Sequence, residues 1–136
     1  MATGRLGTVS DTVVLDAYRR FWTVAAQVGR QPESRWRTQL EPVATDPFLS
    51  ELLEGLTEQQ QRGVVDFGAV ELRPTIAALT PARASILDCQ DASRTGELDR
   101  DTGAVTSVGS SRTATLTRDS AGRWKVTQAR YLPDAC

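Results

Sequence analysis

The sequence predicts an α+β fold in which helices at the start of the chain pack on an antiparallel sheet built from the remainder. Before Gly63, apolar residues recur with the 3.6-residue period of amphipathic helices. After Gly63, stretches rich in Val, Ile, Thr and aromatic residues show the two-residue period of strands. The length of 136 residues is typical of one domain. We therefore expect a flexible leader over residues 1–10 and a single domain over residues 11–136.

The first helix is expected near residues 11–29. Ser10 or Asp11 offers an N-cap, and Gly29 stands where the helix would end. One apolar stripe recurs at helical spacing and comprises Val14, Tyr18, Phe21, Trp22, Ala25 and Val28.

Two shorter helices are expected near residues 33–41 and 46–61. Pro42 ends the first of these, since proline cannot continue a helix. Asp46 and Pro47 are expected to be the N-cap and the first helical residue of the other.

Four later stretches have strand character and together predict the antiparallel sheet: 64–74, 75–90, 110–118 and 123–132. Gly68 lies inside the first stretch and indicates a bulge or bend. The polar segment 93–111 predicts a long hairpin or a flexible loop. The sequence DSAG at 119–122 is typical of a hairpin turn.

Composition excludes several kinds of site. The net charge is −1 without a long run of one sign, which argues against nucleic-acid binding. The chain has no histidine, which excludes Ser-His-Asp and Cys-His catalysis and the usual zinc and non-haem iron ligand sets. We expect neither a metal nor a cofactor.

No apolar stretch of about 20 residues is present, so we expect no membrane-spanning segment. The first residues lack the apolar core of a signal peptide, which leaves open a native signal or anchor absent from this sequence.

Short motifs add a resemblance to known proteins. AYRRFW (17–22), ILDCQDAS (86–93), GRWKV (122–126) and the terminal cysteine resemble a group of small actinobacterial proteins. Those proteins are mostly secreted or lipid-anchored, and most have no assigned function. The order of helices and strands looks like the cystatin-like, nuclear-transport-factor-2-like superfamily, which includes ketosteroid isomerases and SnoaL-like polyketide cyclases. The resemblance implies a strongly curved antiparallel sheet that forms a cone around a pocket.

The resemblance also suggests catalytic residues. Isomerase-type members use a carboxylate base together with a tyrosine and a protonated acid. Tyr18 on the first helix and Asp88 on a strand match these residues in type but not in motif.

A polar patch is expected near the pocket. Strand alternation places Asp88 and Gln90 on the side of Ile86, and Asp91 on the opposite side. On the last strand, the side of Trp124 and Val126 would continue through Gln128 and Arg130. We therefore expect Asp88 to be buried and paired with Arg130 or Gln128, as a ligand-orienting group or as a structural ion pair.

Four aromatic residues form a second candidate site, either as the wall of an apolar pocket or as ordinary core: Tyr18, Phe21, Trp22 and Trp36.

The third candidate site consists of the two cysteines, Cys89 and Cys136. A nucleophilic Cys89 is disfavoured, because Asp88 and Asp91 would raise the pKa of its thiol. In an oxidising compartment we expect a Cys89–Cys136 disulfide, and two free thiols are the alternative.

These observations favour a non-catalytic binding or assembly module, secreted or tethered to the cell envelope. Its partner would be a small apolar ligand in the pocket or an envelope protein on the sheet face, and a homodimer through that face is also open. The alternative is a small isomerase, dehydratase or cyclase that uses Asp88 and Tyr18.

Overall fold

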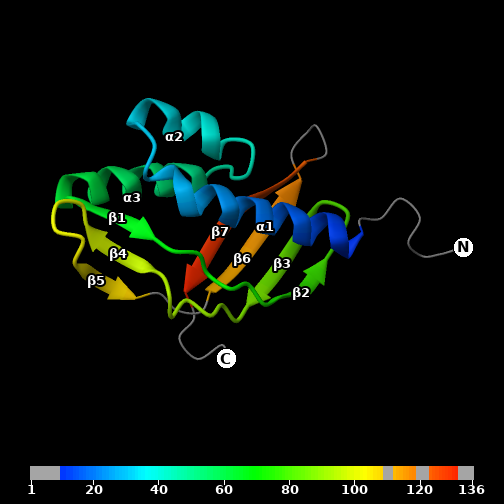
Figure 1. Cartoon of the computed structure of the whole chain (residues 1–136). Coiled ribbons are helices and arrows are strands. Elements are labelled where there is room, and N and C mark those ends of the chain that lie inside the picture. Colours follow the sequence, from blue (N-terminus) through cyan, green and yellow to red (C-terminus); the bar gives the residue numbers. More distant parts are fainter. Residues whose placement is uncertain (1–9, 109–111, 119–122, 132–136) are drawn as a thin grey trace, which may run out of the picture.

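The computed structural model describes residues 10–108, 112–118 and 123–131. Over these residues, helices come first and strands follow (Figure 1), in the order α1 (Asp11–Val28), α2 (Glu33–Leu40), α3 (Phe48–Arg62), β1 (Val64–Phe67), β2 (Pro74–Leu79), β3 (Arg83–Asp88), β4 (Gly96–Asp99), β5 (Val105–Val108), β6 (Arg112–Arg118) and β7 (Trp124–Tyr131). The predicted order of helices and strands is confirmed. None of these helices is long and apolar enough to cross a membrane.

Helix α1 begins and faces the core as its sequence predicts. The Ser10 side chain accepts a hydrogen bond from the Thr12 amide at 3.1 Å, which satisfies one of the unpaired donors of the first turn. The buried residues of α1 follow the helical period: Val14, Ala17, Tyr18, Phe21 and Val28.

Helix α3 begins slightly later than expected. Its first residue is Phe48 and its N-cap is Pro47, so Asp46 is not the N-cap and Pro47 is not the first helical residue. Asp46 still stabilises the start, because its Oδ1 accepts hydrogen bonds from the Ser50 amide at 2.9 Å and the Ser50 hydroxyl at 2.7 Å. Gly63 ends the helix in the left-handed region at a φ of 71°, which a glycine adopts without steric cost.

The strands form two antiparallel sheets, with orders β1-β4-β5 and β2-β3-β6-β7. Both sheets lie on the same side of the helices, the smaller one beneath α3 and the larger one beneath α1 (Figure 1). The chain passes between them at Gly68, where φ is 74° and an added Cβ would collide with the Arg94 carbonyl. An isolated bridge between Glu71 and Asp91 joins the two connecting segments.

The polar segment 93–111 contains a hairpin rather than only a loop, since β4 and β5 pair with each other. The predicted turn at 119–122 lies outside the described residues.

Strand β7 contains a bulge at Thr127. Val126 and Gln128 pair with consecutive residues of β6, so Thr127 is one residue more than the ladder requires. The buried side of β7, formed by Trp124 and Val126, therefore continues at the partly buried Ala129 and not at Gln128.

Two apolar clusters form the core. One lies between α1 and the larger sheet and includes Tyr18, Phe21, Ile86, Trp124 and Val126. The other joins the three helices and includes Val28, Trp36, Leu40, Leu49 and Leu56.

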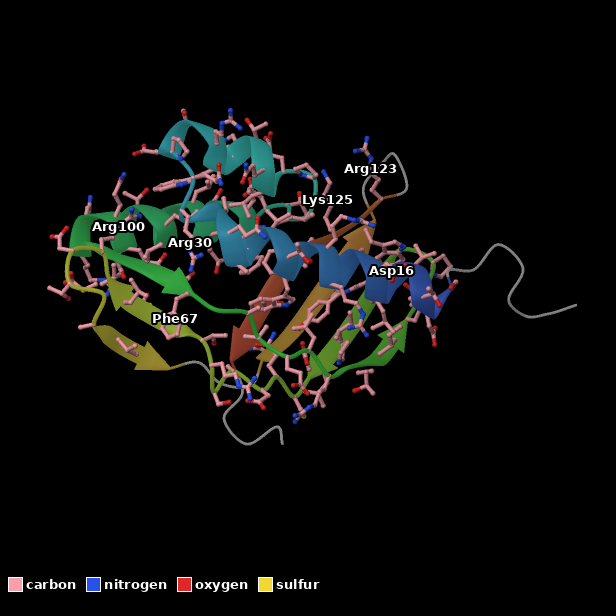
Figure 2. The ribbon with its side chains drawn as sticks, viewed as in Figure 1. Asp16, Arg30, Phe67, Arg100, Arg123 and Lys125 are labelled. Atoms are coloured by element: carbon pink, nitrogen blue, oxygen red, sulfur yellow. The ribbon has the colours of Figure 1, made fainter. Side chains whose placement is uncertain are left out.

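Exposed arginines connect the helices to the smaller sheet (Figure 2). Arg30 donates to the Asp66 carbonyl, and Arg100 donates to the Gly29 carbonyl just after α1, both at 3.2 Å. A cation at this helix end also complements the negative end of the helix dipole.

Candidate functional site

Asp88 lies at the centre of a buried polar cluster beneath α1. Its side chain is 0 % exposed, which confirms the predicted burial. The Tyr18 hydroxyl donates to Oδ2 at 2.6 Å, and the Arg73 amide donates to Oδ1 at 2.7 Å. Gln90 Nε2 donates to Oδ2 at 3.3 Å. Three donors from α1, the segment before β2 and the segment after β3 thus satisfy one carboxylate.

The predicted pairing of Asp88 with Arg130 or Gln128 is wrong. Both Gln128 and Arg130 are exposed, and neither joins the buried cluster. The reason is the bulge at Thr127, which shifts the alternation of β7 by one residue and turns both side chains away from the core. The polar patch therefore contains Asp88 and Gln90 but not Gln128 or Arg130.

The Tyr18 hydroxyl is held in its neutral form. Burial raises the pKa of Tyr18 far above its ordinary value, and the hydrogen bond to Asp88 and the charge of Asp88 raise it further. The neighbouring side chains of Trp22 and Gln90 lower the pKa of Tyr18, and their effect is weaker. Tyr18 is therefore a donor to Asp88 at physiological pH.

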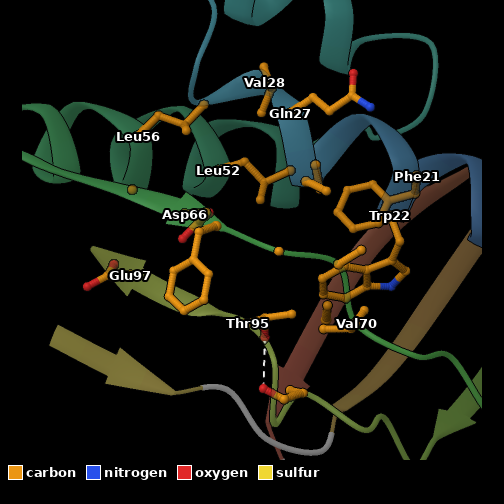
Figure 3. Close-up of a pocket in the computed structure, with 18 of the residues that line it drawn as sticks. Phe21, Trp22, Gln27, Val28, Leu52, Leu56, Asp66, Val70, Thr95 and Glu97 are labelled. Atoms are coloured by element: carbon orange, nitrogen blue, oxygen red, sulfur yellow. Dashed lines mark hydrogen bonds between the residues drawn. The ribbon is translucent and has the colours of Figure 1, made fainter. Parts of the chain in front are cut away.

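A cavity of about 970 Å³ opens between α1, α3 and the two sheets (Figure 3). Its wall is mainly apolar, with Phe21, Trp22, Leu52 and Val70 around the interior. Further apolar lining comes from Val28, Phe48, Leu56, Phe67, Leu72, Ala92 and Ala129. The volume lies near the upper end of the range of about 300–1,000 Å³ that is usual for small-molecule sites.

The four predicted aromatic residues divide between the cavity and the core. Phe21 and Trp22 line the cavity and pack edge to face, with ring centroids 5.3 Å apart. Tyr18 is covered by other residues and does not line the cavity. Trp36 packs in the cluster between the helices, and its Nε1 donates to the Gln31 carbonyl at 3.0 Å.

The sequence did not indicate the polar end of the cavity. Asp66 of β1 and Glu97 of β4 are cross-strand partners, and the Gln59 amide of α3 donates to both, at 2.9 Å and 2.7 Å. Arg62 forms a salt bridge with Glu97 at 3.3 Å. The hydrogen bond from Gln59, assisted by that from Arg62 and its charge, lowers the pKa of Glu97. No local motif marks these residues, because the pairing of β1 with β4 is what brings the two carboxylates together.

Gln90 connects the buried cluster to the cavity. It lines the cavity, whereas Asp88 and Tyr18 lie behind the wall. An acid–base pair needs to reach the atom it protonates or deprotonates. In this arrangement, the Tyr18 hydroxyl and the Asp88 carboxylate contact each other and are shielded from the cavity.

Asp91 does not extend the buried cluster. It accepts hydrogen bonds from the amide and hydroxyl of Ser93, which hold a local turn and lower the pKa of Asp91. The described residues contain no group of three or more His, Cys, Asp or Glu side chains arranged to hold a metal ion.

Cys89 is half-buried and is not a free thiol. Its predicted partner, Cys136, lies outside the described residues, so the pairing stays a prediction.

Comparison with known proteins identifies the fold. No protein-family model and no curated protein matches the chain. The crystal structure of the intermembrane-space region of the chloroplast protein ARC6 matches 93 % of this chain and 98 % of its own, with a TM-score of 0.65 and 15 % identity. A conserved protein from Planctomyces limnophilus matches 90 % of this chain and 94 % of its own, with a TM-score of 0.58 and 16 % identity.

A ketosteroid isomerase-like protein from Erwinia carotovora atroseptica matches 87 % of this chain and 91 % of its own, with a TM-score of 0.57 and 14 % identity. Identities this low establish a shared fold and nothing about activity. The chain therefore has the α+β cone fold of the nuclear-transport-factor-2-like and ketosteroid-isomerase-like proteins.

Proposed function

We propose that this protein is a non-catalytic binding module that holds a small, largely apolar molecule in the cavity between its helices and sheets. The observation that carries the proposal is the cavity of about 970 Å³, because a densely packed domain rarely retains so much space. Aromatic and aliphatic side chains from both halves of the chain form its wall. Polar side chains also line the cavity, among them Gln59, Asp66, Gln90 and Glu97, and such groups orient a bound molecule.

The isomerase, dehydratase or cyclase alternative receives less support. Tyr18 and Asp88 lie 2.6 Å apart, as an acid–base pair would. However, both side chains are 0 % exposed, and the carboxylate already accepts hydrogen bonds from three donors. A substrate in the cavity would meet Gln90 and Trp22 before either of them. We therefore assign Asp88 a structural role.

We further propose that the protein acts outside the cytoplasm, with Cys89 bridged to Cys136. The bound state of Cys89 supports this, since the sequence contains only two cysteines. The resemblance to secreted or lipid-anchored proteins agrees with it. Docking of an envelope protein and a homodimer through the sheet face have no comparable supporting feature, so the cavity takes precedence.

Binding can be tested with the fluorescent apolar probe 1-methoxypyrene. We expect saturable binding to the wild-type protein, measured by fluorescence anisotropy. The variant Gly55→Phe should weaken it at least about tenfold, since Gly55 lines the cavity and an added Cβ meets no atom within 4 Å.

Thr57→Phe is the matched control, because Thr57 is exposed on the same helix and does not line this cavity. Its affinity should equal that of the wild type. Absence of saturable binding, or an equal effect of both variants, would contradict the proposed site.

A further inference from the structure

The cavity wall contains a buried hydrogen-bond acceptor that no group in the described part of the chain satisfies. Gln90 lines the cavity and is 7 % exposed, and its Oε1 has no hydrogen-bond partner among those residues. Buried polar atoms in folded proteins are nearly always paired, because an unpaired one has lost its hydration without compensation. An unsatisfied acceptor beside a cavity therefore indicates what a bound molecule should supply.

The neighbours of Gln90 fix the orientation of its amide. Nε2 donates to Asp88 Oδ2 at 3.3 Å. Both oxygens of Asp88 already accept hydrogen bonds from Tyr18 and Arg73, and the Gln90 amide presents its nitrogen to Asp88, so the amide oxygen faces away from Asp88. Asp88 and Tyr18 lie behind the wall and Gln90 lines the cavity, so we take Oε1 to lie on the cavity side of the amide.

The oxygen can reach a bound molecule with little rearrangement. Oε1 itself is covered, but the torsion that carries a glutamine amide is broad and soft. Contact with a bound molecule requires a rotation about this torsion that uncovers Oε1. Asp88 keeps its hydrogen bonds from Tyr18 and Arg73 during this movement, so the buried carboxylate remains paired.

We propose that the cavity binds an apolar ring compound that carries a neutral hydrogen-bond donor, such as a hydroxyl group, and that Gln90 Oε1 accepts this hydrogen bond. The inference rests on the proposed binding function and specifies the chemical class of the ligand. A cationic donor is a poorer fit for Gln90, since Asp66 and Glu97 at the other end of the cavity would attract it more strongly.

Two probes of nearly equal shape test the donor. The hydroxyl group of 1-hydroxypyrene donates a hydrogen bond, whereas 1-methoxypyrene only accepts one. We expect the hydroxyl compound to bind the wild-type protein at least about tenfold more tightly at pH 7, in fluorescence titrations. Partitioning into an apolar site would favour the methoxy compound, so this preference cannot come from hydrophobicity alone.

In Gln90→Met, which keeps the length of the side chain and removes the acceptor, the two affinities should agree within about twofold. Gln27→Met is the matched control, because Gln27 also lines the cavity but is exposed; it should keep the wild-type preference.

The outcomes separate this inference from the proposed function. Equal binding of both probes to the wild-type protein would refute the donor requirement and leave the binding module intact. No binding of either probe would refute both. If Gln90→Met does not fold, the comparison of the two probes on the wild-type protein still decides. Retention of the hydroxyl preference in a folded Gln90→Met would assign the hydrogen bond to another residue and overturn the role of Gln90.

Discussion

Asp88 illustrates how a charged side chain is accommodated in an apolar core. A carboxylate buried without partners would be strongly destabilising, so a fold that retains one has to supply donors. Two of the donors, Tyr18 and Arg73, come from other parts of the chain, and the third, Gln90, lies only two residues after Asp88. The cluster therefore connects α1 to the sheet and to the segment that enters β2. Its main effect is on stability and on the relative positions of these elements.

Removal of this carboxylate should be costly. Asp88→Ala leaves the Tyr18 hydroxyl and the Gln90 amide buried without their acceptor, and we expect a loss of at least about 3 kcal/mol in the free energy of unfolding. Asp88→Asn retains one acceptor oxygen and should cost less.

Asp91→Ala is the matched control. Asp91 is more exposed and serves a local turn, so the loss in the free energy of unfolding should stay within about 1 kcal/mol. Urea denaturation measures all three. A loss below about 1 kcal/mol for Asp88→Ala would contradict the role of the cluster.

Tyr18 should make the protein sensitive to alkali. The pKa of Tyr18 is raised in the folded state, so its contribution to stability is complete below the unfolded pKa of about 10 and is lost as the pH rises above it. One such group lowers the free energy of unfolding by about 1.4 kcal/mol per pH unit in that range.

Tyr18→Phe should therefore be less stable at pH 7 by about 1–3 kcal/mol, because Asp88 loses a donor, yet show a flatter decline between pH 10 and 11. Urea denaturation at a series of pH values measures both effects. If the free energy of unfolding declined equally with pH in the wild type and the variant, Tyr18 would ionise in the folded protein as readily as in the unfolded chain.

Residue-level prediction from the sequence succeeded where it depended on local alternation. The facing of Asp88 and Gln90 along β3 follows from the two-residue period, and both are buried. The same reasoning failed for Gln128 and Arg130, because Thr127 forms a bulge without a glycine or proline to signal it. The donor Arg73 could not be foreseen, since its position depends on how the segment before β2 lies against the sheet, and only the resemblance to isomerases suggested that Tyr18 would meet Asp88.

The helices and strands themselves were largely predictable. Periodicity gave the three helices and the start of the sheet after Gly63, and the boundaries differ by at most two residues for α1, α2 and α3. The stretch 64–74 was predicted as strand with a bulge or bend at Gly68; strand β1 ends at Phe67, and the close approach of the Arg94 carbonyl requires a glycine at position 68. The pairing of β1 with β4, which forms the smaller sheet, depends on long-range contacts and had no local signal.

Two glycines of α3 should respond oppositely to the same substitution. Gly55 lies inside the helix and a Cβ there meets no atom within 4 Å, so Gly55→Ala should stabilise the protein by about 0.5–1 kcal/mol. Gly63 ends the helix at a φ of 71°, where alanine is strained, and Gly63→Ala should destabilise it by about 1 kcal/mol. Thermal and urea denaturation of the two variants provide the measurement. A shift in the same direction for both would argue against the described helix end.

At the scale of the whole molecule, the cavity results from the way two sheets and three helices meet. Helix α1 covers the larger sheet while α3 covers the smaller one (Figure 1), and a cavity of about 970 Å³ lies between these elements (Figure 3). Residues from Arg19 to Ala129 contribute to its wall. A cavity with so distributed a lining leaves no motif in the sequence. The resemblance to cone-shaped proteins predicted a pocket, and the aromatic residues were one candidate for its wall. Of its polar groups, Gln90 was expected near the pocket, whereas Gln59, Asp66 and Glu97 became apparent from the structure alone.

The predicted bridge between Cys89 and Cys136 would act on the whole molecule. It would close a loop of nearly fifty residues and restrict the unfolded chain, which the loop-entropy model values at about 4 kcal/mol. That is a large part of the about 5–15 kcal/mol typical of a domain. We expect the native protein to resist alkylation until it is reduced, as measured by intact mass. Reduction and Cys136→Ser should lower the free energy of unfolding by similar amounts.

Because Cys89 directly follows Asp88, reduced protein should also lose part of the stabilisation from the buried cluster. Asp88→Ala should therefore cost less stability after reduction than before. Two alkylated thiols in the unreduced native protein would refute the bridge, and an unchanged cost of Asp88→Ala in both redox states would show that the cluster holds its geometry without it.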